Sequence, residues 1–84
     1  MKVVQFEGVK NQFIIYPDDG SVYFQSYETI IAKKDRKTDI VYLDVNNWDY
    51  SKTTGKYRNK FLGEDKKETE RKINSGIYKL ADLR

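Results

Sequence analysis

The stretch that decides the fold is QFIIYPDDGSVYFQ, residues 12–25. β-Branched and aromatic residues dominate both of its ends, as is typical of strands. Between them lies Pro17-Asp18-Asp19-Gly20, in which proline presets the backbone of a turn and glycine supplies the left-handed residue. Strands joined by so short a turn run antiparallel. The stretch therefore predicts a β-hairpin.

The sequence on either side of this hairpin predicts more strands. Residues 29–33 and 40–43 have the same β-branched and aromatic character, and the charged loop 34–39 separates them. Residues 3–6 indicate a further short strand, which Gly8 ends. Residues 12–44 are thus expected to form a small antiparallel sheet.

The second half of the chain changes to helical periodicity. Ser51 can cap a helix over about 51–62, and Gly63 stands where a left-handed residue ends it. Asp65 and Glu68 have the spacing of a capping box.

That box opens a second helix over about 66–75, ending near Gly76. Residues 77–80 form either a final short strand or an extended tail. The fold class is α+β, with two consecutive helices packed on the sheet in a single domain of residues 1–84.

Composition excludes several kinds of chemistry. The chain has no cysteine and no histidine, so it lacks disulfides, thiolate metal sites and the commonest general base. It contains no apolar run of membrane-spanning length and no glycine-rich phosphate loop, and residues 1–20 lack the basic-then-apolar order that a signal peptide would have. We therefore expect a cytoplasmic, non-enzymatic protein that needs neither a metal nor a cofactor and does not enter a membrane.

Positive charge is concentrated in the middle of the chain. When Lys and Arg are counted against Asp and Glu, residues 1–32 have a net charge of −2, residues 33–60 of +4 and residues 61–84 of +1. A basic region of this kind favours polyanions as partners.

The region from Trp48 to Gly63 combines basic and aromatic residues. Lys52, Lys56 and Lys60 recur every four residues and lie along one side of the predicted helix, so they can follow phosphates. On this hypothesis the candidate binding residues are Lys52, Lys56, Arg58, Asn59 and Lys60, with Trp48, Tyr50 or Tyr57 stacking on bases.

The alternative interpretation is that the same helix merely anchors itself on the sheet. Tyr50, Thr54, Tyr57 and Phe61 share one helical face, and the lysines would then form an ordinary solvated surface. Gly55 lies inside this helix, so it either weakens the helix or lets another group approach closely.

A second basic cluster lies in the loop between the later strands. It could extend a phosphate-binding surface, or it could serve only solubility and edge protection. Its residues are Lys33, Lys34, Arg36 and Lys37.

Several motifs together resemble an uncharacterised family of small proteins from phages and plasmids of low-GC Gram-positive bacteria. The resemblance spans roughly residues 12–83, and its centre is the Trp48–Gly63 segment. The residues that carry it are Phe24-Gln25-Ser26-Tyr27, Val41-Tyr42-Leu43-Asp44, Trp48-Asp49-Tyr50-Ser51, Thr53-Thr54, Lys56-Tyr57-Arg58-Asn59, Phe61-Leu62-Gly63, Lys67-Glu68-Thr69 and Lys72-Ile73. The resemblance implies a mobile-element accessory protein in the bacterial cytoplasm and assigns no role to any residue.

Two functions remain open at this point. The first is binding of nucleic acid through the basic aromatic helix. The alternative is inhibition of a host defence or replication protein, which would meet the same surface or the acidic turn at Asp18 and Asp19.

Overall fold

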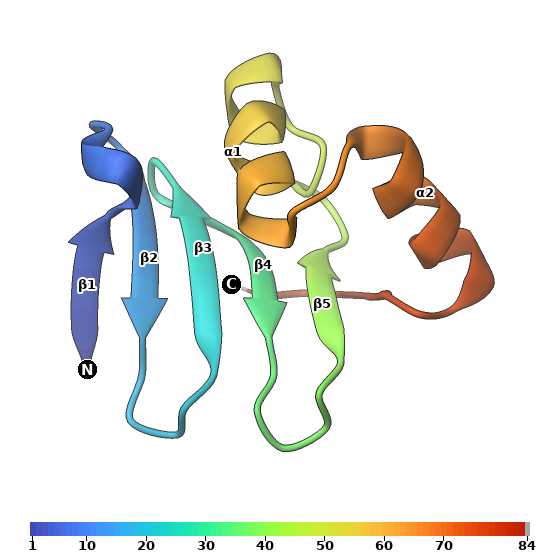
Figure 1. Cartoon of the computed structure of the whole chain (residues 1–84), viewed down its shortest axis with the longest axis horizontal. Helices are drawn as coiled ribbons and strands as arrows, with labels where there is room; N and C mark the ends of the chain where they lie inside the picture. The colour runs from blue at the N-terminus through green and yellow to red at the C-terminus, as the bar shows by residue number, and fades with distance from the viewer. Residues whose placement is uncertain (84) are drawn as a thin grey trace.

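The protein is described here by a computed structural model, which describes residues 1–83. Over those residues a six-stranded sheet has the strand order β1-β2-β3-β4-β5-β6 (Figure 1). The strands are β1 (Lys2–Gln5), β2 (Gln12–Tyr16), β3 (Val22–Ser26), β4 (Thr29–Lys34), β5 (Val41–Asp44) and β6 (Lys79–Ala81). A short 3-10 helix, η1 (Phe6–Gly8), follows β1.

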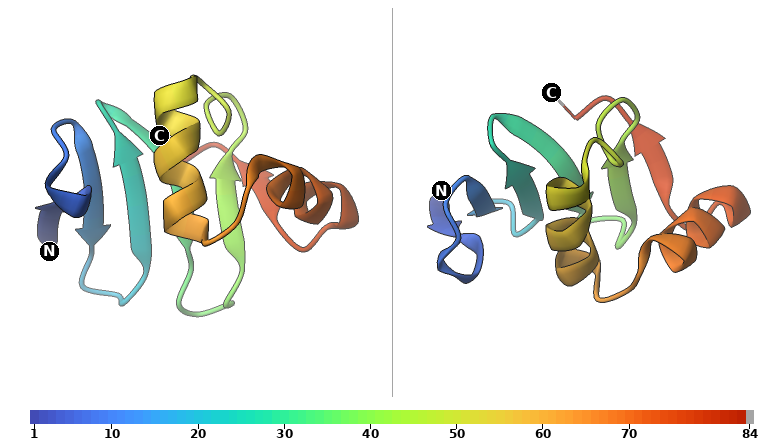
Figure 2. Two further views of the ribbon diagram at one scale, coloured as in Figure 1. Left: turned by 45° about the horizontal axis from the view of Figure 1, so that its top comes forward. Right: turned by 90° about the horizontal axis from the view of Figure 1, so that it is seen from above.

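The first five strands form antiparallel neighbours, as the short connections predict. The final strand is present too, but it pairs with β5 in parallel, which the sequence did not reveal. A parallel pair needs a long crossover. Here α1 (Lys52–Leu62) and α2 (Lys66–Ser75) supply it, and both helices lie on one side of the sheet (Figure 2).

Both helices begin and end at the residues that the sequence predicts. Ser51 accepts a hydrogen bond from the Thr54 backbone N–H at 3.1 Å, and Gly63 adopts the left-handed conformation at φ 73°. Asp65 caps α2 by accepting from the Glu68 N–H at 2.9 Å. The Glu68 carboxylate instead pairs with Arg71 at 2.7 Å, so only half of the capping box forms.

The core lies between the sheet and α1. Phe24 in β3 is fully buried, and its ring lies 5.7 Å from that of Phe61 and 5.9 Å from that of Phe6. Tyr57 packs on Phe6 from α1, and Thr54 hydrogen-bonds Ser26 at 3.0 Å. The predicted helical face is therefore confirmed at Thr54, Tyr57 and Phe61.

Tyr50 is the exception, and its predicted place in that face is wrong. Its side chain is 72% exposed. It precedes the N-cap residue Ser51, so the helical periodicity does not extend to it.

A polar network attaches α2 and the last strand. The Glu64 carboxylate accepts hydrogen bonds from Thr69 and Lys72, each at 2.7 Å, and from the Tyr78 hydroxyl at 2.8 Å. Burial alone would raise the pKa of Glu64, but these hydrogen bonds outweigh it and hold the pKa below its usual value. Glu64 is therefore ionised throughout the neutral range.

Candidate functional site

Arg58, a predicted partner-binding residue, is engaged inside the protein. Its side chain is 1% exposed. One terminal nitrogen, Nη1, donates to the Trp48 carbonyl at 2.8 Å and to Asp49 at 3.3 Å, and the other, Nη2, donates to Asn59 at 3.0 Å. Arg58 and Asn59 thus fix the segment that leads into α1 instead of projecting from it.

The aromatic residues near Arg58 divide into three environments. Trp48 is partly buried, and the Arg58 guanidinium carbon lies 5.2 Å from its ring centroid, in cation–π geometry. Tyr57 belongs to the core, so its ring cannot stack on a base. Tyr50 is the one of the three that is exposed.

The lysines of α1 also differ from one another. Lys60 forms an ion pair with Glu7 at 3.2 Å, whereas Lys56 is exposed with its ammonium 5.4 Å from the Tyr57 ring centroid. Lys52 is exposed and forms no ion pair within residues 1–83. Of the predicted row, Lys52 and Lys56 are the members that remain available to a partner.

The second basic cluster does not form one surface. Lys34 reaches toward α1 and donates to the Phe61 carbonyl at 2.9 Å. Lys33, its neighbour in β4, points to the opposite side of the sheet, because successive strand residues alternate. Arg36 packs over Gly20, and Lys37 is exposed in the loop.

The side of the sheet opposite α1, which we call the open face, carries a row of tyrosines and lysines. Strand register places Tyr23 opposite Lys33, Lys33 opposite Tyr42, and Tyr42 opposite Lys79. Tyr23, Lys33 and Tyr42 each have a neighbour in the same strand that is buried under α1. These neighbours are Phe24, Ala32 and Leu43. The row must therefore project from the other side, which no helix of residues 1–83 covers (Figure 2).

Apolar side chains continue the open face toward β1. Ile15 pairs with Tyr23, and Val3 pairs with Ile15. Two residues further along these strands, Phe13 pairs with Gln25 on the same face. Neighbouring strands are about 4.8 Å apart, so Tyr23 and Tyr42 stand roughly 10 Å apart with Lys33 between them.

The charge of Lys33 is held in place. Its ammonium lies 3.1 Å from the Asp35 carboxylate and 5.4 Å from the Tyr23 ring centroid. The hydrogen bond to Asp35 is the main reason that the pKa of Lys33 is raised, so the side chain is cationic at neutral pH. Hydrogen bonds from Thr38, followed by that from Lys33, lower the pKa of Asp35 to about 2.

The last residues of the described chain border the open face. After β6 the chain passes behind β5 as viewed in Figure 1. The Leu83 N–H donates to the Asp44 carboxylate at 2.9 Å. Asp44, two residues beyond Tyr42 in β5, is fully buried, so the end of the described chain covers part of the open face.

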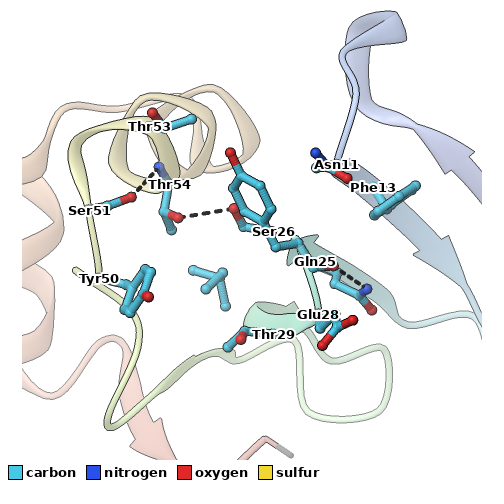
Figure 3. Close-up of a pocket in the computed structure, with 12 residues that line it drawn as sticks. Asn11, Phe13, Gln25, Ser26, Glu28, Thr29, Tyr50, Ser51, Thr53 and Thr54 are labelled. Atoms are coloured by element: carbon cyan, nitrogen blue, oxygen red, sulfur yellow. Dashed lines mark hydrogen bonds between the residues drawn. The ribbon is translucent and has the colours of Figure 1, made fainter.

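A pocket of about 910 Å³ adjoins the open face at the end of β3. Phe13 and Gln25 line it together with residues at the start of α1, where Ser51 and Thr54 lie (Figure 3). Tyr27 also lines it and is held at φ 56°, a conformation that is strained for an aromatic residue. The pocket extends the open face toward the N-terminus of α1.

Sequence reasoning missed the open face, although one signal was present. Tyr23 and Tyr42 each precede a buried apolar residue in a predicted strand, and Lys33 follows one. Alternation alone shows that the sheet has two faces, but only the register across three strands brings these three side chains into one row.

Comparison with known proteins identifies one family. The profile of a family described as "Family of unknown function (DUF8033)" matches residues 2–76. No curated protein and no solved structure matches the chain. Residues 1–83 contain no helix long and apolar enough to cross a membrane, and no acidic cluster suited to a metal ion.

Proposed function

This chain belongs to the DUF8033 family, which has no assigned function, and we propose one from the geometry. The protein is a non-enzymatic module that binds single-stranded nucleic acid on the open face of its sheet. The observation that carries the proposal is the row Tyr23–Lys33–Tyr42–Lys79, in which aromatic rings and ammonium groups alternate across four neighbouring strands.

Each element of the row suits an unpaired strand. A base that stacks on an aromatic side chain gains about 1–3 kcal/mol, whichever base it is. Lys79, exposed beside Tyr42, can neutralise a phosphate and release counterions, whereas Lys33 between the rings is already paired with Asp35. Exposed aromatic residues on an antiparallel sheet bind single-stranded RNA by this means in other folds. A duplex keeps its bases stacked on one another, so it cannot use the rings.

The proposal moves the contact surface away from the one that the sequence indicates. The helix hypothesis relied on Arg58 as well as the lysines, and Arg58 is buried. Lys52 and Lys56 lie on α1, on the opposite side of the sheet from the row. The two surfaces can therefore be tested separately.

The experiment is a fluorescence anisotropy titration with a labelled, mixed-sequence single-stranded oligonucleotide at low salt. The double variant Tyr23→Leu/Tyr42→Leu removes both rings but keeps apolar bulk, and we expect its affinity to fall at least about 30-fold, the equivalent of about 2 kcal/mol. The matched control, Lys52→Ala/Lys56→Ala, should bind within about threefold of the unmodified protein.

The reverse pattern would overturn the proposal. If the α1 double variant lost binding and the tyrosine variant kept it, the helix would be the interface. Absence of binding to any single strand at low salt would reject nucleic acid as the ligand. Far-ultraviolet circular dichroism of each variant confirms that the sheet is retained.

We also propose the setting that the sequence resemblance implies, an accessory protein of a phage or plasmid in the cytoplasm of its bacterial host. Inhibition of a host protein is the alternative role. It predicts capture of one specific host protein by the unmodified chain and by the Tyr23→Leu/Tyr42→Leu variant alike.

A further inference from the structure

A second candidate site lies on the helical side of the molecule. A hollow of about 570 Å³ runs beside α1 toward the start of α2. We call it the basic hollow, because four cations and one carboxylate line it: Lys52, Lys56, Arg58, Lys66 and Asp49. The chain has 16 Lys and Arg against 13 Asp and Glu, so removing these five groups would leave 12 of each sign. The hollow thus accounts for the whole net charge of +3.

Gly55 forms part of the wall of the basic hollow, and its presence needs an explanation. A glycine inside a helix costs about 1 kcal/mol relative to alanine. A Cβ atom built on Gly55 would lie 3.5 Å from Nη2 of Arg58, which is ordinary van der Waals contact. Packing therefore does not require glycine here. What the missing side chain provides is open space beside a guanidinium group.

The guanidinium itself has unused hydrogen-bonding capacity. Arg58 has five N–H donors, and its three hydrogen bonds engage Nη1 twice and Nη2 once. The Nε atom is buried and has no hydrogen-bond partner among residues 1–83. Buried donors are rarely left unpaired, so an unpaired one points to a missing partner. Adjacent N–H groups of arginine form the fork that binds a phosphate or carboxylate through two oxygens.

We propose that the basic hollow binds a phosphate-type dianion, with Gly55 leaving room for it beside Arg58 and with Lys52 and Lys56 as its flexible cationic partners. A dianion fits better than a monoanion because Asp49 already supplies one negative charge, paired with Lys66 at 2.7 Å, and a net charge of +3 remains. This inference does not depend on nucleic-acid binding by the open face.

The test is a titration of the ¹⁵N-labelled protein with inorganic phosphate at pH 7.5, followed by two-dimensional NMR. Sodium chloride at equal ionic strength is the reference. We expect saturable shifts of the amides of residues 52–58 and 66 with phosphate only. Gly55→Ala should weaken phosphate binding at least tenfold, and Lys56→Ala should weaken it as well.

Gly55→Ala is informative because it should not harm the fold. Alanine is the better helix former, so the melting temperature should stay equal or rise. The matched control is Asn74→Ala, an exposed change in α2 that also raises helix propensity and should leave phosphate binding unchanged. A nucleoside 5′-monophosphate that displaces phosphate would indicate a nucleotide as the natural source, and failure to displace it would indicate free phosphate.

Two results would overturn the inference. One is a set of phosphate shifts that are linear in concentration and the same as those with chloride. The other is unchanged phosphate affinity in Gly55→Ala. Neither result bears on the tyrosine variants of the open face.

Discussion

Tyr23 and Phe24 are consecutive residues of β3, yet they belong to two different regions of the molecule. Phe24 is fully buried among Phe6, Phe61 and the neighbouring strands. Tyr23 lies on the open face beside Lys33. The comparison shows that one sheet has divided its two faces between tasks. The face under α1 stabilises the fold, whereas Tyr23, Lys33 and Tyr42 on the open face are only partly buried.

The largest expected effect is on the covered face. Phe24→Ala should lower the free energy of unfolding by about 3–5 kcal/mol, because it removes a buried ring and leaves a cavity. Such a loss is a large fraction of the stability of a small domain. Urea denaturation measures it, with Tyr23→Ala as the control, expected to lose about 1 kcal/mol or less. Equal losses in both variants would contradict the division between the faces.

A smaller loss of stability is expected when Arg58, the buried cation of α1, is removed. Arg58→Ala should cost about 2–3 kcal/mol, because the Trp48 carbonyl and Asn59 lose a charged donor. Lys56→Ala, an exposed change in the same helix, should cost under about 0.5 kcal/mol. Thermal unfolding of the two variants side by side checks this. If Arg58→Ala were as stable as Lys56→Ala, Arg58 would be a surface residue after all.

The third prediction concerns pH and the attachment of α2. The pKa of Glu64 is lower in the folded protein than its ordinary value of 4.5, so the unfolded state binds more protons as pH falls. Its stabilising contribution is therefore present above pH 4.5 and is lost as pH falls through the folded pKa. The pKa of Tyr78 is raised above its ordinary value of 10, chiefly by burial and then by Glu64. The folded protein therefore holds the Tyr78 proton more tightly than the unfolded chain does, and the protein loses stability as strongly alkaline pH removes that proton.

Glu64→Gln tests this linkage. It should cost about 1–2 kcal/mol at pH 7 and should flatten the loss of stability between pH 5 and pH 3. Denaturation midpoints measured across that range give the slope. The control is Glu70→Gln, an exposed change in α2. An acid slope that is identical in Glu64→Gln and in the unmodified protein would contradict the prediction.

The smallest effect is expected at Tyr50. Because this side chain is 72% exposed, Tyr50→Ala should change stability by less than about 0.5 kcal/mol. Tyr57→Ala, in the core, should cost about 3 kcal/mol. Chemical denaturation distinguishes the two. Comparable costs would mean that Tyr50 does anchor the helix, as its spacing suggested.

The sequence predicted the local structure well because local signals determine it. A few adjacent residues determine a hairpin turn or a helix cap. The helix-terminal residues Ser51, Gly63 and Asp65 each lie where the sequence predicted. The parallel pairing of β6 with β5 was not predictable in this way. That strand has three residues, too few for a periodic pattern, and each of them pairs with a residue 37 positions earlier in the chain.

The candidate sites were less predictable, for physical reasons that differ between residues. Arginine is almost never fully buried, so nothing in the sequence marked Arg58 as an internal residue. Tyr50 matched the helical spacing but lies before the cap. The Tyr23–Lys33–Tyr42 row depends on the register of three strands, and a slip of one residue would turn each side chain to the other face.

The central claim is that bases stack on the open face, and photo-crosslinking tests it most directly. A single-stranded oligonucleotide that carries 5-iodouracil is irradiated in complex with the protein, and the modified residue is located by mass spectrometry. The geometry predicts adducts at Tyr23 or Tyr42. Adducts at Trp48 or Tyr50, with none on the open face, would contradict the account and return the interface to the start of α1.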